Sequence, residues 1–516
     1  MAVVEQKDCR QPLLMEQAAN WLMVKIRENK VPILASAIFG ALAYGFAFTN
    51  KLVNHDEVFC LFSKGATVTS GRWGLGALDS LFPNYSMPWL YGIFSIALIT
   101  AAICLVIRIF DIQSKLLQVL TAGSILVFPS LIGTFGYMFT SSSYALSFFL
   151  AALAVWFLQR PHKLFALPAL ACMVLSLSIY QSYIAVAASL LMLVLIQRLL
   201  QGGKATAVIG KGVFFVAFLI ASLGLYWIGT KAVLRITDTQ FSEYASDSIA
   251  FTLSSIPSGI GLAYSSFFRF LAEGYCGLIP TLLSRLVHFL FIAATIVLLL
   301  IQCVRQKMKT SSCILLLLLT ALLPLAINCM YLITTAGSIH TLVLYGFVAV
   351  YLLGITAADT CLPSAGLVQR AALDAVACAM AVIVLLNTYL ANEAYLNLYL
   401  RYENAYAFYT TLLADIRMTP GFDEDTKLAL AGYWQEPDFY SEKFEVLDQL
   451  TGVDGFTANS YSGERFLEYY LGAKIPFATD EEIAAIQNTP EYEAMAVYPY
   501  YGSIAVIDDI LVVKLS

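Results

Sequence analysis

The chain has 516 residues, of which 59% are hydrophobic and 13% are charged, and its mean hydropathy is +0.75. Soluble proteins carry about 25% charged residues, so this composition excludes an ordinary water-soluble fold. The net charge is −5, which argues against a nucleic-acid partner because neutralising phosphates requires clustered Lys and Arg. We expect an integral membrane protein whose surroundings are the lipid bilayer.

Residues 1–30 are expected to form a leader on the cytoplasmic side of the membrane. Within this leader, the segment from Gln11 to Glu28 alternates apolar and charged residues at helical spacing and includes Trp21 and Lys25. This pattern is typical of an amphipathic helix that lies among the lipid headgroups.

Residues 31–390 are expected to form a membrane domain of about eleven helices, because a span needs about 20 apolar residues to cross about 30 Å of hydrocarbon. The fold class that this predicts is an all-α polytopic membrane protein. The candidate spans are 31–49, 88–108, 116–136, 141–158, 164–180, 182–197, 212–230, 284–304, 312–333, 341–358 and 371–390.

The orientation of these spans follows from the basic residues, since Lys and Arg are retained on the cytoplasmic side. With the N-terminus inside, the inner segments hold 16 basic residues and the outer loops between spans hold seven. Eleven spans then place the C-terminus outside. We expect a multi-pass protein of the cell (plasma) membrane with an extracytoplasmic C-terminal domain.

Residues 391–516 are expected to form that domain, because 21 of the 35 acidic residues fall in this last quarter of the chain. The segments 393–417 and 481–487 are predicted to be helical. Two apolar runs flank Asp508-Asp509 as in a terminal β-hairpin. The domain is therefore predicted to be α/β or α+β, and we expect it to serve acceptor recognition rather than the chemical step.

Two long external loops are predicted at 51–87 and 231–283. The first carries the adjacent carboxylates Asp56 and Glu57 just beyond the first span. A carboxylate at the membrane surface is placed to take a proton from an acceptor hydroxyl or to bind sugar hydroxyls. The alternative is structural: Asn54 caps a short helix whose first turn contains both carboxylates.

Several other residues near the outer face are candidates for substrate binding. Arginine grips phosphate through paired donors, and the alternative for each arginine is an anchor at the membrane interface. Polar groups at the ends of spans are expected to face a cavity, because polar groups in hydrocarbon are costly. The candidates are Arg72, Arg269 and Arg285 for the donor phosphate, and Tyr180, Gln181 and His340 for the substrate pocket. The segment 264–270 is predicted to be an amphipathic helix.

The chain has no P-loop, no Gly-rich dinucleotide turn, no zinc-ligand spacing and no Gly-x-Ser-x-Gly motif. We therefore expect no nucleotide cofactor and no metal.

The arrangement of these motifs resembles the glucosyl transferase GtrII family, which belongs to the GT-C class of membrane glycosyltransferases. The motifs that carry the resemblance are Asp56-Glu57 after one span, Ser70-Gly71-Arg72-Trp73, Ile179-Tyr180-Gln181-Ser182-Tyr183, Gly502-Ser503-Ile504 and Val512-Val513-Lys514-Leu515. The chain departs from the commoner doublet of two aspartates, which leaves open which of Asp56 and Glu57 is the base.

The resemblance implies a GT-C-like fold and a glycosyltransferase that uses a polyprenyl-phosphate-linked sugar. We expect transfer of a hexose, glucose by resemblance, to a cell-envelope glycan on the external face, with inversion, without a metal and with an aspartate base. Two alternatives remain open. One is an envelope polysaccharide polymerase or ligase, and the other is a lipid-linked glycan transporter or flippase, although no internal repeat typical of transporters is found.

Overall fold

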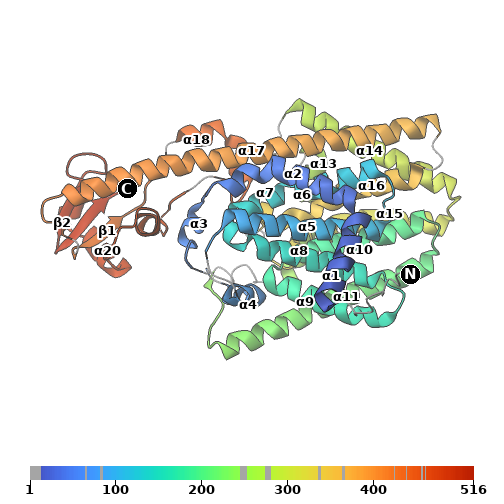
Figure 1. Ribbon diagram of the computed structural model, residues 1–516, viewed down its shortest axis with the longest axis horizontal. Coiled ribbons are helices and arrows are strands. Elements are labelled where there is room, and N and C mark those ends of the chain that lie inside the picture. The colour runs from blue at the N-terminus through green and yellow to red at the C-terminus, as the bar shows by residue number, and fades with distance from the viewer. Residues whose placement is uncertain are drawn as a thin grey trace, which may run out of the picture.

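The computed structural model describes residues 13–516, except for 64, 66, 82–84, 244–252, 274–280, 335–338, 363–365, 424, 437, 455–456 and 460. The excluded residues include parts of both predicted external loops. Helices dominate the described chain, and a small sheet lies near the C-terminus (Figure 1).

The first helix, α1 (Leu14–Glu28), runs at a steep angle to α2 (Lys30–Thr49), which follows it (Figure 1). None of its residues is buried, and Trp21 is 63% exposed. Its Glu28 accepts a hydrogen bond of 2.9 Å from Arg108 at the end of α5. The exposed residues of this helix are both charged and apolar, and its position among the headgroups stays a prediction.

Nine described helices are long and apolar enough to cross a membrane, so the chain is a multi-pass membrane protein, as its composition predicts. They are α2, α5 (Pro88–Phe110), α8 (Met138–Leu158), α10 (Tyr183–Leu200), α11 (Ala205–Ile236), α14 (Leu282–Arg305), α15 (Thr310–Ile327), the continuous pair of η6 (Thr341–Phe347) and α16 (Val348–Cys361), and α17 (Leu367–Met418).

Two predicted spans have a different form. The segment predicted at 116–136 is a pair of helices, α6 (Lys115–Leu126) and α7 (Pro129–Gly136), bent by 44°. Pro129 explains the break, because proline has no N–H to donate and restricts the residue before it. The segment predicted at 164–180 contains α9 (Ala166–Ile179), whose 14 residues are about 21 Å long and thus shorter than the hydrocarbon thickness.

The two predicted loops are also partly helical. The first contains α3 (His55–Phe59) and α4 (Trp73–Leu81). In the second, α11 continues to Ile236, and α13 (Ile256–Glu273) includes the predicted amphipathic helix. Short 3-10 turns, η1 (Lys163–Phe165), η2 (Leu253–Ser255) and η4 (Cys329–Leu332), complete the bundle.

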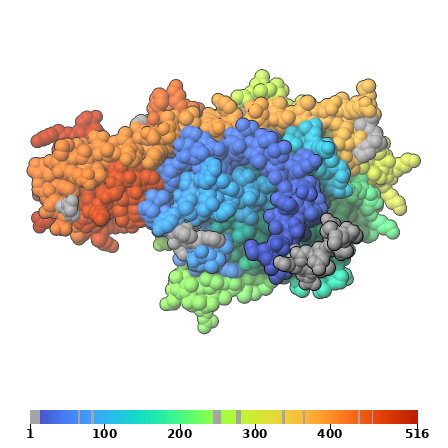
Figure 2. Space-filling model, in the orientation of Figure 1, coloured from blue at the N-terminus to red at the C-terminus, as the bar shows by residue number. Residues whose placement is uncertain are grey.

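The bundle has two distinct ends. The first, called the α1 end below, carries α1 and the C-terminal ends of α5 and α10. The other, here the α3 end, carries α3, α4 and the C-terminal domain, which projects from the bundle (Figures 1 and 2). The loop after α2 and the C-terminal domain are in direct contact, since Tyr461 donates a hydrogen bond to Asp56.

The longest helix, α17, has 52 residues and runs without a break through residue 391. At 1.5 Å per residue it is about 78 Å long, so it both crosses the membrane and forms the base of the C-terminal domain (Figure 1). Its Arg401 forms a fully buried ion pair of 2.6 Å with Glu436. The predicted helix at 393–417 is confirmed as part of α17.

The C-terminal domain contains a three-stranded sheet in the order β1-β3-β2. The central strand β3 (Ile510–Lys514) pairs parallel with β1 (Lys427–Ala431) and antiparallel with β2 (Ile504–Ile507). Asp508 and Asp509 both have positive φ, as a two-residue hairpin turn requires. The predicted hairpin is therefore confirmed. The other elements are α18 (Asp438–Lys443), η8 (Glu445–Gln449), α19 (Gly463–Arg465), η9 (Phe466–Tyr470), α20 (Asp480–Gln487) and α21 (Pro490–Glu493).

Candidate active site

Asn54 holds three separate segments together at the α3 end. Its Oδ1 accepts the backbone N–H of Glu57 at 2.9 Å and so caps α3. Its Nδ2 donates to the carbonyl oxygens of Gly136 at 3.0 Å and Gly452 at 2.9 Å. The structural alternative for this motif, a capped helix, is therefore present. The cap also joins the first loop to α7 and to the C-terminal domain.

The approach of α7 to the C-terminal domain requires glycine on both sides. A Cβ atom on Gly136 would lie 2.1 Å from the carbonyl oxygen of Gly452. Gly452 itself has a φ of +94°, which side chains rarely adopt. The site is therefore built on a backbone contact that no larger residue would permit.

Glu57 is fully buried and is satisfied by the protein itself. Its carboxylate forms an ion pair with Lys51 and accepts a hydrogen bond from Ser86. It also accepts the backbone N–H of Phe139 at 3.2 Å. Lys51 in turn donates to Ser86 at 2.8 Å. A carboxylate enclosed in this way joins the loop to α8 and has little access to a substrate.

Asp56 has the opposite environment, because its side chain is 40% exposed. Its Oδ1 accepts a hydrogen bond of 2.7 Å from the hydroxyl of Tyr461 in the C-terminal domain. Its Oδ2 lies 3.9 Å from Nε2 of His55. Of the two adjacent carboxylates, Asp56 is the one that a substrate can reach.

Tyr461 was not predicted from the sequence, and it is separated from Asp56 by 405 residues. Burial and the hydrogen bond to Asp56 both raise the pKa of Tyr461 above its ordinary value, so its hydroxyl remains a proton donor. No local sequence signal marks it. The C-terminal domain thus contacts the predicted base directly, in addition to any part in acceptor recognition.

A third carboxylate, Asp79 of α4, lies in the same region. Burial raises the pKa of the Cys60 thiol to about 12, and the charges of Asp56, Glu57 and Asp79 add to this rise. All three carboxylates therefore lie within electrostatic reach of one thiol. Asp79 was also missed, although a single acidic residue in an apolar helix after the Arg72 motif was a usable signal.

Arg72 lies against two stacked tyrosines at the start of α4. Its Nη1 donates to the hydroxyl of Tyr144 at 3.0 Å, and its guanidinium lies 5.3 Å from the centre of the Tyr180 ring. The two rings stack 4.2 Å apart. Cation–π contact and a hydrogen bond fix the orientation of the guanidinium. The predicted residues Arg72 and Tyr180 are thus brought together.

Gln181 and Tyr226 fix the turn that presents Arg72. Gln181 Nε2 donates to the carbonyl of Ser70 at 3.1 Å and to the Tyr226 hydroxyl at 2.9 Å. The Tyr226 hydroxyl donates to the carbonyl of Gly71 at 3.1 Å. Gly71 has a φ of +73°, and a Cβ there would lie 2.7 Å from the Tyr226 oxygen. Gln181 therefore positions the loop that carries Arg72.

Arg269 and His340 line one cavity of about 450 Å³ between α13 and the C-terminal domain, which contributes Gln449 and Thr451. Arg269 also pairs with Glu273 at 3.0 Å. Burial and the charge of Arg72 lower the pKa of His340 to about 4, so its ring is neutral at neutral pH. Arg285 is exposed on α14 and is not among the residues that line this cavity.

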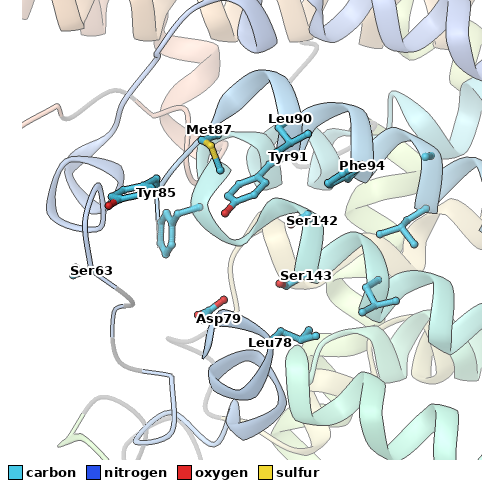
Figure 3. Close-up of a pocket in the computed structure, with 14 residues that line it drawn as sticks. Ser63, Leu78, Asp79, Tyr85, Met87, Leu90, Tyr91, Phe94, Ser142 and Ser143 are labelled. Carbon is cyan, nitrogen blue, oxygen red and sulfur yellow. The ribbon is translucent and has the colours of Figure 1, made fainter. Parts of the chain in front are cut away.

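A second, larger cavity of about 680 Å³ lies between α4, α5 and α8. Its deeper wall is apolar and includes Phe94, Ala97, Leu98 and Leu146. Closer to the α3 end, Asp79, Tyr91 and Ser143 point into the same space (Figure 3). Phe139, whose N–H binds Glu57, also lines this cavity.

Among the residues that the structure describes, no group of three or more His, Cys, Asp or Glu side chains is placed to hold a metal ion. The charged groups at the α3 end include carboxylates, arginines and Lys51, and two cavities lie beside them. Together with nine apolar helices in the described part of the chain, this arrangement defines a multi-pass membrane protein with charged side chains gathered at one end of the bundle.

The comparison with known families agrees. The family model described as glucosyl transferase GtrII matches residues 45–351, which is more than half of the chain. The chain belongs to this family and is a glycosyltransferase, an enzyme with a sugar donor and a glycan acceptor. A search of curated proteins and a search of solved structures found no match. The matched region contains all eight predicted site residues and ends before Tyr461.

Asn54 offers a sharp test of how this end of the bundle is assembled. Asn54→Asp keeps the oxygen that caps α3 but replaces the Nδ2 donor with an anion facing two carbonyl oxygens. We expect Asn54→Asp to lower the thermal unfolding midpoint of the purified protein more than Asn54→Ala does, because the buried group becomes repulsive. Equal midpoints for Asn54→Asp and wild type would contradict this account.

Proposed function

We propose that the enzyme transfers glucose from a polyprenyl phosphate donor to a cell-envelope glycan at the α3 end of the bundle. The acceptor oxygen forms a bond with the anomeric carbon while the bond from that carbon to the phosphate oxygen breaks. The acceptor proton goes to Asp56, and polyprenyl phosphate leaves. A single base on one side of the sugar and a leaving group on the other give inversion.

The observation that carries this proposal is the contrast between the two adjacent carboxylates. Glu57 is buried and bound to Lys51, whereas Asp56 is exposed and accepts a hydrogen bond on Oδ1 from the hydroxyl of Tyr461. A general base must be reachable by the proton that it accepts. We therefore assign the base to Asp56 and a structural role to Glu57.

Fixed positive charge is available for the departing phosphate. Arg72 is held in one orientation by Tyr144 and Tyr180, and Arg269 lines the cavity that also contains His340. Preoriented cations stabilise charge that develops on a leaving group. We propose that these two arginines take this role in place of a metal. His340, which is neutral, adds a hydrogen-bonding group and no charge. Arg285, exposed on α14, fits an interface anchor better.

The cavity between α4, α5 and α8 supports a lipid-linked donor. From Met87 to Leu98 it follows α5 for about 16 Å, which is about the depth of one leaflet. Its deeper wall is apolar, and its outer part carries hydroxyl groups. An isoprenoid chain fits the inner part of such a cavity, with its head directed toward the α3 end.

The positive-inside rule supports an external site. The 16 basic residues of the predicted inner segments lie before the first span or in segments that connect spans, including Arg108, Arg198 and Arg305 at helix ends away from α3. We propose that the α1 end is cytoplasmic and that the α3 end and the C-terminal domain are extracytoplasmic.

The orientation is testable with tags in intact cells. A tag at the C-terminus is expected to be cut by a protease that cannot cross the membrane, and a tag at the N-terminus is expected to be protected until the cells are opened. A protected C-terminal tag would place the site in the cytoplasm and refute the external assignment.

The base assignment predicts the effect of Asp56→Asn. This change is nearly isosteric and keeps an oxygen for Tyr461, so the protein level in membranes should stay normal while turnover of polyprenyl-phosphoglucose falls about 10²- to 10⁴-fold. Asp111→Asn at the α1 end is the matched control, because asparagine tolerates the left-handed conformation found there. Wild-type turnover in Asp56→Asn would show that Asp56 is not the base.

The cavity predicts the effect of filling it. Ala97→Trp should raise KM for the polyprenyl donor about tenfold to a hundredfold, since excluding one isoprene-sized group forfeits about 1.5–3 kcal/mol of apolar burial. Ile93→Trp, on the exposed face of α5 and outside the cavity lining, is the control. An unchanged KM in Ala97→Trp with normal protein levels would mean that the chain binds elsewhere.

A further inference from the structure

The C-terminal domain contributes a side chain to the candidate active site. Tyr461 reaches Asp56 from outside the region that the family model matches. The Tyr461 ring lies edge-on to His55 and to Phe59, each with ring centres 5.8 Å apart. His55 and Phe59 lie on either side of Asp56 in the sequence of α3. Their contacts with the Tyr461 ring, together with the hydrogen bond, hold the Tyr461 hydroxyl at the Asp56 carboxylate.

The turn that carries Tyr461 is itself fixed. Asn459 Oδ1 accepts the backbone N–H groups of Tyr461 and Ser462, each at 3.2 Å, and the hydroxyl of Ser462 at 3.0 Å. The side chain of an Asx turn thus orients the backbone at Tyr461. The hydroxyl of Tyr461 is presented by a preorganised turn and not by a free loop.

The segment before this turn is anchored to the bundle at several points. Thr451 N–H donates to Thr341 Oγ1 at 2.9 Å, and Asn397 of α17 donates to the carbonyl of Val453 at 3.1 Å. Glu436, the buried partner of Arg401, accepts the N–H of Thr457 at 2.9 Å. Together with the Asn54 contact to Gly452, these bonds define the position from which Tyr461 reaches α3.

We propose that Tyr461 is a positioning residue for the Asp56 base. Its hydroxyl binds Oδ1 and fixes the plane of the carboxylate, which directs Oδ2 toward the acceptor. The hydrogen bond also favours the ionised carboxylate, the form that accepts a proton. This inference rests on the proposed function, since it requires Asp56 to be the base, and it assigns part of the catalytic apparatus to the C-terminal domain.

The first experiment compares Tyr461→Phe with Tyr433→Phe. Tyr461→Phe removes the hydroxyl and keeps the ring against His55 and Phe59, whereas Tyr433 is an exposed tyrosine of the same domain. We expect Tyr461→Phe to lower kcat about tenfold to a hundredfold, as loss of a hydrogen bond to a charged group implies, with KM for the donor unchanged. Tyr433→Phe should behave as wild type. A wild-type kcat in Tyr461→Phe would overturn the proposal.

The pH–rate profile separates positioning from a structural role. Without the Tyr461 hydroxyl, the ionised carboxylate loses a stabilising donor, so the acid limb should move to higher pH. Other titratable groups near Asp56 are His55, Glu57, Cys60, Tyr137 and Tyr144, and His55 Nε2 lies 3.9 Å from Asp56 Oδ2. The pH–rate profile is therefore measured again in the His55→Gln background, where adding Tyr461→Phe should still move the acid limb to higher pH. An unmoved limb would contradict the proposal.

A double-mutant cycle distinguishes this inference from the proposed function. If Tyr461 acts through Asp56, Tyr461→Phe has no further effect on the residual rate of Asp56→Asn. An equal loss in both backgrounds would overturn the proposal and leave the base assignment intact. Wild-type turnover in Asp56→Asn would instead refute the base assignment, whatever Tyr461→Phe does. Unchanged thermal midpoints in both single variants exclude misfolding as the cause.

Discussion

The α3 end depends on the hydrogen bonds of one buried amide. Asn54 uses one oxygen to cap α3 and both N–H groups to bind carbonyls of α7 and of the C-terminal domain. These groups are all buried, where an unmade hydrogen bond costs about 1–3 kcal/mol. A change in the break between α6 and α7, or in the path of the C-terminal domain, would therefore shift α3. A shift of α3 would change the direction of the Asp56 side chain.

This one helix gives two adjacent carboxylates different surroundings. Successive residues of a helix point about 100° apart, so a helix that directs Glu57 inward to Lys51 and Ser86 leaves Asp56 at the surface. The inner carboxylate is neutralised by a lysine and joins the loop to α8. The outer one faces the domain that supplies Tyr461. In this chain the acidic doublet is thus one anchor and one exposed group.

Hydropathy predicted the nine long apolar helices of the described chain, because each span must satisfy its own backbone and bury an apolar length, but it did not predict the break between α6 and α7 or the short length of α9. It also predicted the terminal hairpin from a local pattern around Asp508-Asp509. It could not predict Tyr461, because the contact with Asp56 joins residues 405 positions apart. The different surroundings of Asp56 and Glu57 could not be predicted for the same reason, because the burial of Glu57 against Lys51, Ser86 and Phe139 is a property of the fold.

The attachment of the C-terminal domain limits how an acceptor can reach Asp56. The domain continues from α17 without a break, and the Arg401–Glu436 ion pair is fully buried where they meet. Removing one partner of a buried ion pair costs about 3–5 kcal/mol, because the other charge is left buried without its partner. Swinging the domain aside in each catalytic cycle would therefore be costly. We infer that the acceptor approaches Asp56 from its exposed side, while Tyr461 stays in place on Oδ1.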